Sequence, residues 1–366
     1  MAPSFGADDN RVAKQNGIGS LTLVDEQGRF TKEVNDFYGQ YVKDEFYTEN
    51  DTKPKLPADV QIIIKLKESG LLFNSEKYEH SYPHCWRTDK PILYYPMDSW
   101  FVKTTDHKQR MMELNKTINW KPSSTGEGRF GNWLENLVDW NLSRSRFWGI
   151  PLPIWRTENG KEEICIGSLE DLKAEIDRSV NLGFMKKNPL ADFKAGDFSD
   201  KNYSIFDLHR PYVDDIILAS NSGLRMTREL DLIDVWFDSG SMPYAQLHYP
   251  FENKELFANR FPADFIAEGV DQTRGWFFTL HAISTLLFDS VAYKNVVSNG
   301  LVLDKDGNKM SKRLGNATDP FQTIGKHGAD ATRWYMISNA QPWDNLKFDE
   351  EGILEVRRKF FGTLYN

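Results

Sequence analysis

Residues 263–278 (ADFIAEGVDQTRGWFF) constrain the fold of this chain more than any other stretch. Residues 265–267 form a short apolar run that is typical of a buried parallel strand. A polar turn begins at Glu268, and apolar residues at helical spacing then predict a helix over 273–287 with Asp271 as its N-cap. A strand, a polar turn and a helix in this order often form a nucleotide site at the carboxyl end of a parallel sheet. The pattern predicts an α/β fold, although a plain structural turn is an equally common reason for it.

A basic loop follows some forty residues later. Residues 309–313 (KMSKR) come after an apolar run and a tight turn predicted over 304–308 (DKDGN). Lys309, Lys312 and Arg313 on such a loop are suited to binding phosphate groups. A solvated basic loop is the common alternative for a cluster of this kind.

These two stretches together resemble the class I aminoacyl-tRNA synthetases. The resemblance rests on residues 268–277 (EGVDQTRGWF) followed by residues 309–313. Residues 234–240 (DVWFDSG) and 146–155 (RFWGIPLPIW) narrow it to the isoleucyl-tRNA synthetases. It extends over nearly the whole chain. It implies the second half of a Rossmann-like catalytic domain with α+β insertions and the start of a helical anticodon-binding domain.

The resemblance also implies a division of the chain into segments. Residues 1–75 would be the C-terminal remnant of the editing domain, and residues 76–225 the return to the catalytic core with further insertions. Residues 226–300 would form the second half of the catalytic domain, residues 301–345 the basic loop and a region that contacts the tRNA stem, and residues 346–366 the start of the anticodon-binding helices. We expect the catalytic half that carries the family's His-x-Gly-His signature to be missing.

Carboxylates at the end of a strand can accept hydrogen bonds from ribose hydroxyls or an ammonium group, and Gln272 can both donate and accept. The resemblance assigns catalysis to Lys309 and Lys312, of which Lys312 is the stronger candidate for ATP contact. It assigns contacts with ATP and the aminoacyl-adenylate to Glu268, Gly269, Asp271, Gln272, Met310, Ser311 and Lys312.

The amino-acid pocket is expected to lie between Trp236 and Trp276, with Gln272 beside it. A pocket between two indoles favours a branched aliphatic side chain, and two core tryptophans are the alternative. Isoleucine and valine differ by one methylene, so such a pocket can favour isoleucine by only about 1–3 kcal/mol of binding free energy. This pair of amino acids is itself the standard example of limited discrimination by an apolar pocket. Asp9 falls on the position that holds the amino group of a mischarged end during editing, with a solvated turn as its alternative.

The implied function is that of an isoleucine–tRNA ligase, which activates isoleucine with ATP and Mg²⁺, transfers it to tRNA(Ile) and edits mischarged valine. We expect the isolated chain to fold but to be inactive. Three other functions stay open: a non-catalytic module that binds tRNA or a partner, a free-standing editing protein, and a valine or leucine ligase.

Composition sets wider bounds. The net charge of −8 argues against a general nucleic-acid coat, although tRNA can still bind a local basic patch. Two cysteines suit a reducing cytoplasm, and no apolar run approaches the roughly 20 residues of a membrane helix. We therefore expect a cytoplasmic protein without membrane contact, and the resemblance implies a monomer.

Residues 80–86 (HSYPHCW) hold three potential zinc ligands: His80, His84 and Cys85. Zinc sites usually have four nitrogen or sulfur ligands, and Cys165 is the other cysteine. Some relatives carry a cysteine-rich knuckle where this chain has residues 156–160 (RTENG). We expect no structural zinc.

Several local patterns predict further elements. Residues 17–28 are expected to form a hairpin, residues 57–70 a helix, and residues 91–95 with 100–102 a buried strand. Helices are also expected to begin near Ala329 and over 350–360. Residues 162–214 resemble a variable insertion without a chemical interpretation.

Tryptophan and arginine alternate over residues 133–148. This pattern predicts a packed helix whose arginines pair with acids. A phosphate contact from Arg144 or Arg146 is the alternative. Residues 234–240 are expected to form a strand followed by a polar turn.

Overall fold

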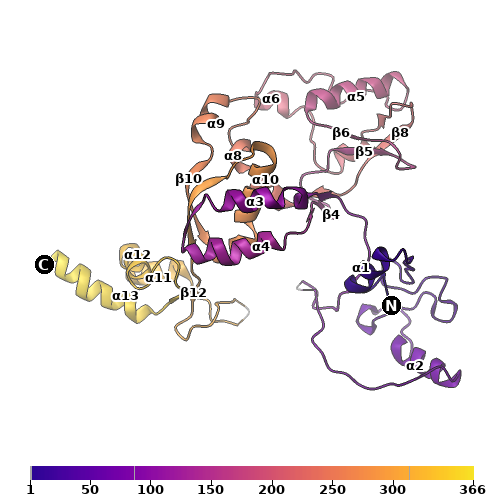
Figure 1. Ribbon diagram of the computed structural model, residues 1–366, viewed down its shortest axis with the longest axis horizontal. Coiled ribbons are helices and arrows are strands. Elements are labelled where there is room, and N and C mark those ends of the chain that lie inside the picture. The colour runs from indigo at the N-terminus through magenta and orange to yellow at the C-terminus, as the bar shows by residue number, and fades with distance from the viewer. Residues whose placement is uncertain (1, 86, 313) are drawn as a thin grey trace. The chain divides into compact units, whose positions relative to one another are not determined.

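The computed structural model describes residues 2–85, 87–312 and 314–366. Trp86 and Arg313, the last residues of the histidine-rich stretch and of the basic loop, lie outside the described residues. The chain divides into two compact units, Met1–Asp98 and Ser99–Asn366 (Figure 1). Among the described residues, no helix combines the length and the apolar character needed to cross a membrane.

The first unit contains little regular structure. The predicted helix over 57–70 is confirmed as α2 (Ala58–Glu68), and Gly70 follows it with a φ of +71°. The predicted hairpin is wrong in its strands, because its described residues form only an isolated bridge between Val24 and Phe30. The turn itself is present, since Asp25 Oδ1 accepts hydrogen bonds from two backbone amides. The remaining elements of this unit are α1 (Ala7–Gln15), η1 (Asn35–Phe37) and η2 (Asp44–Phe46).

A parallel three-stranded sheet forms the centre of the second unit. Its strand order is β10 (Ala263–Gly269), β11 (Tyr293–Asn299) and β2 (Asn119–Lys121). Helix α10 (Trp276–Phe288) connects β10 to β11, so these three elements form a βαβ unit. This helix is apolar on nearly every side and is therefore buried rather than amphipathic.

The predicted strand over 265–267 is confirmed as parallel, but its predicted burial is wrong. β10 is the outer strand of the sheet, and the Phe265 side chain is 61% exposed. An apolar run identifies a strand in the sequence, but only the strand order decides whether both of its faces are covered.

The predicted start of the following helix is also wrong. Asp271 lies within a 3₁₀ turn, η6 (Val270–Arg274), and is not the N-cap of the helix. The turn forms because Thr273 donates its hydroxyl to the carbonyl of Val270. Helix α10 begins only at Trp276, whose backbone N–H donates to the side-chain oxygen of Gln272.

Aromatic and aliphatic side chains from the sheet and its helices form one core. Trp120 of β2 packs edge-on against Phe277 of α10, at 5.4 Å between ring centroids. Helices α3 (Lys108–Asn115) and α4 (Gly131–Glu135) contribute residues to this core. Helix α7 (Val235–Gly240) packs on α10, and α8 (Met242–Ala245) and α9 (Lys254–Arg260) border a cavity beside β10 and α10. Two short helical segments, η3 (Thr104–His107) and η4 (Thr125–Phe130), precede α3 and α4.

The predicted long helix over 133–148 is wrong. Helix α4 ends at Glu135, and the chain continues as β3 (Trp140–Asn141) and β4 (Ser143–Arg144). Both strands find partners far away in the sequence, in β1 (Phe101–Val102) and β9 (Leu232–Ile233). These pairings explain why periodicity alone misled the prediction.

Two strand predictions also need correction. Among residues 91–95 and 100–102, only β1 is a strand, and its Phe101 is exposed rather than buried. In the stretch 234–240, residues 235–240 form the helix α7 after the strand β9 instead of a polar turn. Asp234 makes this helix possible, because its side chain accepts a hydrogen bond from the N–H of Trp236 and acts as the N-cap.

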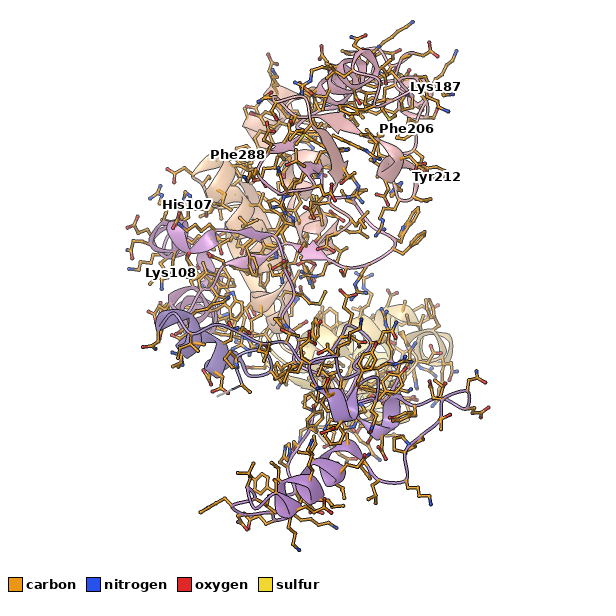
Figure 2. All side chains as sticks on the ribbon, turned by 90° about the vertical axis from the view of Figure 1, so that its right-hand side faces the viewer. His107, Lys108, Lys187, Phe206, Tyr212 and Phe288 are labelled. Carbon is orange, nitrogen blue, oxygen red and sulfur yellow. The ribbon has the colours of Figure 1, made fainter. Side chains whose placement is uncertain are left out.

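An antiparallel sheet and one long helix form a separate core in the same unit. Helix α5 (Leu169–Asn181) lies beside this sheet in Figure 1. Its Ile176 and other apolar residues belong to the same buried cluster as residues of the sheet. Lys187, Phe206 and Tyr212, which belong to this part of the chain, are labelled in Figure 2. The sheet consists of β6 (Glu163–Cys165), β5 (Ile154–Thr157), β8 (Arg225–Arg228) and β7 (Leu218–Ala219), and α6 (Asp200–Tyr203) and η5 (Tyr212–Asp215) complete this part.

The last part of the chain is helical. The two predicted helices near Ala329 and over 350–360 are confirmed as α12 (Ala329–Ser338) and as α13 (Glu350–Val356) continued by η7 (Arg357–Phe361). The other elements here are β12 (Val302–Leu303), α11 (Pro320–His327), β13 (Leu346–Lys347) and α14 (Gly362–Tyr365). β12 pairs with β13, so the segment before the basic loop is tied to the helices that follow it.

His281 is a fully buried histidine in the middle of α10. Its Nε2 lies 2.9 Å from the carbonyl oxygen of Met111 and must donate to it. Its Nδ1, which would accept the second proton, is buried and has no partner among the described residues. Burial therefore lowers the pKa of His281 to about 4, well below the usual value near 6.5.

This pKa predicts a pH-dependent stability. Between pH 6.5 and pH 4 the unfolded chain binds a proton at His281 that the folded chain does not, so stability falls as the pH falls. Replacing His281 with Gln, which can still donate to Met111, should reduce the loss of unfolding free energy between pH 7 and pH 5 by about 2 kcal/mol. Urea unfolding at both pH values measures this difference.

The exposed His107, labelled in Figure 2, provides the control variant His107→Gln, which should behave like the wild type. An unchanged pH dependence in His281→Gln would contradict the prediction.

Candidate functional site

The turn at the carboxyl end of β10 gathers four of the predicted site residues. Glu268 and Gly269 end the strand and pair with Ser298 and Asn299 of β11. Glu268 and Gln272 are half-buried, whereas the Asp271 side chain is exposed. The turn therefore presents two carboxylates and one amide at the edge of a parallel sheet, where groups of a ligand can accept or donate hydrogen bonds.

Gly269 is required by the position of Asp271. A Cβ atom on Gly269 would lie 2.6 Å from Oδ1 of Asp271, because this carboxylate folds back over the end of the strand. Gln272 then bridges two neighbours, since its Nε2 donates to Asp271 (3.0 Å) and its Oε1 accepts from the N–H of Trp276 (3.1 Å). The turn and the start of α10 are thus held by one amide side chain.

A distant arginine braces the same turn. Arg129 in η4 donates from Nε to the hydroxyl of the buried Thr273, at 2.9 Å. The hydroxyl of Thr273 in turn donates a hydrogen bond to the carbonyl of Val270. Sequence reasoning missed Arg129, because 144 positions separate it from Thr273 and no local pattern marks it.

Trp236 and Gln272 meet at Gly275, the residue before α10. A Cβ atom on Gly275 would lie 2.9 Å from Oε1 of Gln272 and 3.2 Å from the ring of Trp236. The absence of a side chain at Gly275 therefore lets the indole of Trp236 approach the amide of Gln272. Two of the predicted pocket residues are brought together in this way.

Trp276 lies at the same helix end but lines a different cavity. Its Nε1 donates to the carbonyl of Ser239, at 2.8 Å. Its side chain borders a cavity of about 220 Å³ between α8, α9, β10 and α10, whereas Trp236 borders one of about 660 Å³. The two indoles thus border different cavities.

The larger cavity is lined by aromatic, basic and acidic side chains. Trp148 is 67% exposed and stacks on His209, at 4.5 Å between ring centroids. Arg144 pairs with Asp234 at 2.7 Å, as predicted for an arginine that binds an acid, while Arg146 is exposed. Such a surface can stack on a planar group and bind a negative charge at the same time.

Asp238 supplies an acidic group to this cavity. Its Oδ1 is buried and has no hydrogen-bond partner among the described residues. Burial, and after it the nearby carboxylate of Asp234, raise the pKa of Asp238 above its ordinary value. Sequence reasoning did not single out Asp238, although it lies in the stretch 234–240.

The basic loop begins at a tight turn, as predicted. The amide of Asp304 donates to the carbonyl of Asn308, and an isolated bridge joins Leu303 to Lys309. Gly307 completes the turn with a φ of +92°. Lys309 and Lys312 are exposed, whereas Met310 and Ser311 are half-buried.

Asn316 organises the basic loop from inside. Its Oδ1 accepts from the N–H of Ser311, and its Nδ2 donates to Asp304 and to the carbonyl of Lys309. The hydrogen bond from Asn316 is the main reason why the pKa of Asp304 lies below its ordinary value. Sequence reasoning missed Asn316, although an asparagine after Gly315 is a common signal for a loop.

Asp9 lies in the first unit, in the first turn of α1. Its Oδ2 accepts a hydrogen bond from the backbone N–H of Ala2 at 2.8 Å. The ring Nδ1 atoms of His80 and His84, potential zinc ligands that are not expected to bind zinc, each lie within 3.1 Å of a backbone carbonyl oxygen. No group of three or more metal-binding side chains occurs among the described residues.

Comparison with protein families matches residues 29–349 to the tRNA synthetases class I (I, L, M and V). The chain is 64% identical to the isoleucine–tRNA ligase of Cytophaga hutchinsonii, with 100% of this chain and 33% of that protein covered. The isoleucine–tRNA ligase of Bacteroides thetaiotaomicron is 60% identical, with 100% and 35% covered. The chain therefore spans about a third of the length of the curated relatives that it matches.

Solved structures of low sequence identity are also similar. A Mycobacterium tuberculosis methionyl-tRNA synthetase in complex with methionyl-adenylate has a TM-score of 0.47 and 14% identity, with 77% of this chain and 42% of that chain covered.

The family match takes in most of the chain, including the turn after β10 and the basic loop. The α/β fold built around the parallel β10, α10 and β11 unit agrees with it. The chain belongs to the class I tRNA synthetases.

Proposed function

We propose that this chain forms part of an isoleucine–tRNA ligase, which activates isoleucine with ATP and transfers it to tRNA(Ile). The observation that carries the proposal is the meeting of Trp236 and Gln272 at Gly275. An indole beside an amide provides an apolar wall and a polar group within one small site. The 64% identity to an isoleucine–tRNA ligase supports this choice of amino acid.

Activation joins the isoleucine carboxylate to the α-phosphate of ATP. A carboxylate oxygen attacks the phosphorus atom in line, a new P–O bond forms, the bond to the β-phosphate oxygen breaks, and pyrophosphate leaves. Positioning of the two substrates and neutralisation of the phosphate oxygens account for most of the acceleration. Mg²⁺ enters with ATP as part of that substrate. In the second step a hydroxyl of the terminal tRNA ribose attacks the carbonyl carbon of the adenylate, and AMP leaves.

The residues of the chain have distinct roles in this proposal. Lys309 and Lys312 bring positive charge to the phosphates from an exposed loop, and Met310 and Ser311 shape that loop. Glu268, Gly269, Asp271 and Gln272 hold the adenylate through its amino group and ribose. Trp236 and Gln272 contact the isoleucine side chain, and Trp276, expected from the sequence to be a second wall, supports Gln272 through its backbone N–H.

The proposal extends to the segments implied by the resemblance. Residues 1–75 belong to the editing domain, residues 76–225 return to the core, residues 226–300 and 301–345 carry the adenylate site and the basic loop, and residues 346–366 begin the anticodon-binding helices. Asp9 would hold the amino group of a mischarged end. The enzyme would work as a monomer in the cytoplasm.

A hybrid enzyme tests the proposed function. Residues 1–366 replace the matching third of the Cytophaga hutchinsonii relative, and ATP–pyrophosphate exchange is measured with isoleucine, valine and leucine side by side. Exchange that prefers isoleucine supports the proposal, provided that the relative without this third is inactive. A preference for valine or leucine, or no exchange by a hybrid that melts cooperatively, would contradict it.

Lys312→Ala in the hybrid should lower kcat/KM for isoleucine-dependent exchange by about 100-fold or more, because a charge at the reacting phosphates is lost. Lys305→Ala is the matched control, since Lys305 is an exposed lysine in the tight turn directly before the basic loop. Equal losses in both variants would mean that the loop acts only through its total charge.

Glu268→Ala should weaken binding of a non-hydrolysable isoleucyl-adenylate analogue to the hybrid by roughly 10- to 100-fold, the effect of removing a charged hydrogen-bond acceptor. The melting temperature should stay close to that of the wild type, because Glu268 lies at a half-buried strand end. Calorimetry measures the affinity. Asp264→Ala, which removes an exposed acid from the same strand, should leave it unchanged. A large fall in melting temperature would instead make Glu268 a structural residue.

A further inference from the structure

Trp236 needs a fixed position if it is to discriminate between side chains that differ by one methylene. Its indole lies on α7, a helix of less than two turns, and is 40% exposed. A short exposed helix has little stability of its own. The position of Trp236 therefore depends on what holds the two ends of α7.

The carboxyl-terminal end of α7 is held by close packing on α10. A Cβ atom on Gly240 would lie 2.8 Å from the side chain of Ile283 and 3.1 Å from the backbone carbon of Thr279. The carbonyl of Ser239 also accepts a hydrogen bond from Trp276. This end of the helix thus rests directly against the backbone of its neighbour.

At the amino-terminal end, the backbone N–H of Asp234 donates to the carbonyl of Leu142, and the side-chain hydrogen bonds converge on the Asp234 carboxylate. This side chain is buried, with 4% of the residue exposed. Its Oδ1 accepts from the N–H of Trp236 at 3.3 Å, and its Oδ2 accepts from Nε1 of Trp140 at 3.1 Å and from Arg144 at 2.7 Å. Three donors from β3, β4 and α7 therefore converge on one residue.

The donors to Asp234 are themselves fixed. Arg144 also donates to the carbonyls of Asn141 and Ser143, which close the turn between β3 and β4. The ring of Trp140 packs against Phe237 of α7 and Phe278 of α10. A buried carboxylate with several fixed donors has little freedom to move, so it transmits the position of the strands to α7.

We propose that Asp234 is a positioning residue that sets the place of the Trp236 indole beside Gln272 and thereby the selectivity of the amino-acid pocket. The inference rests on the proposed function, because it names a residue that acts on the same pocket without touching the substrate. Asp234→Asn removes the charge that holds Arg144 and one of the acceptor oxygens. The side-chain tie from the start of α7 to Trp140 and Arg144 is then weakened, while the backbone hydrogen bond from Asp234 to Leu142 remains, and Trp236 moves relative to Gly275.

The first test uses the 366-residue chain itself. Labelling with 5-fluorotryptophan gives one ¹⁹F NMR resonance for each of the eleven tryptophans, and the Trp236→Phe, Trp140→Phe and Trp155→Phe variants assign three of them. In Asp234→Asn the resonances of Trp236 and Trp140 should shift or broaden, while that of Trp155, buried in the antiparallel sheet, stays in place. Asp231→Asn, which removes an acid that accepts from Ser145 nearby, should leave all three unchanged. An unmoved Trp236 resonance in a folded Asp234→Asn chain would overturn the inference.

The second test measures selectivity in the hybrid enzyme. Asp234→Asn should raise KM for isoleucine about tenfold with a smaller change in kcat, and should lower the ratio of kcat/KM for isoleucine over valine by about five- to tenfold. The double variant with Trp236→Phe should lose no more selectivity than Trp236→Phe alone, because a residue that acts through another is not additive with it. Additive losses, or an unchanged ratio, would show that Asp234 has only a structural role.

Two further variants test the same inference if Asp234→Asn does not fold. If Asp234→Asn does not fold, Trp140→Phe and Arg144→Gln each remove one donor and should each lower the same ratio by a smaller factor. Unchanged selectivity in both would contradict the inference. A wild-type hybrid without isoleucine-dependent exchange contradicts the proposed function itself, whereas exchange with unchanged selectivity in the variants contradicts only the role of Asp234.

Discussion

The burial of helix α10 against the parallel sheet is the interaction on which the rest of the second unit depends. Phe277 of this helix packs edge-on against both Trp120 and Tyr293, and the hydroxyl of Tyr293 donates to the carbonyl of Phe277. One turn further along the same helix, His281 donates to the carbonyl of Met111 in α3. Burying aromatic side chains of this size gives most of the stabilisation that such a core can have. The first residues of α10 carry the candidate site, so the same packing places the site.

The turn before α10 is held by residues from several parts of the chain. Arg129 reaches it from η4, and Trp276 donates from α10 to α7. Gly275 leaves room for the side chains of Gln272 and Trp236, and Gly240 lets α7 approach the backbone of α10 at Thr279. A binding site assembled in this way is rigid because its members are fixed by packing outside the site.

The basic loop has a different kind of support. The backbone at Gly300 lies very close to the backbone at Asp344. A Cβ atom on Gly300 would lie 2.2 Å from the carbonyl oxygen of Asp344. The pairing of β12 with β13 continues this contact, and Asn316 ties Asp304 to the backbone of Lys309. The base of the loop is therefore anchored, while the side chains of Lys309 and Lys312 remain exposed. This combination suits groups that must meet a phosphate and then release it.

Elements whose signals are local could be predicted from the sequence alone. The apolar run over 265–267, the turn over 304–308 and the helices near Ala58 and Ala329 follow from periodicity and turn residues, and the structure contains them. The motifs of the β10 turn and of the basic loop identified the family for the same reason, because each is a continuous stretch. Tertiary structure decided what depends on distant partners: the exposure of Phe265 on the outer strand, the strands β3 and β4 in place of a helix, and the junction of Trp140, Arg144 and Trp236 at Asp234. Hydrogen bonds and packing between residues some 90 positions apart leave no periodic pattern in the chain, so only the folded molecule brings them together.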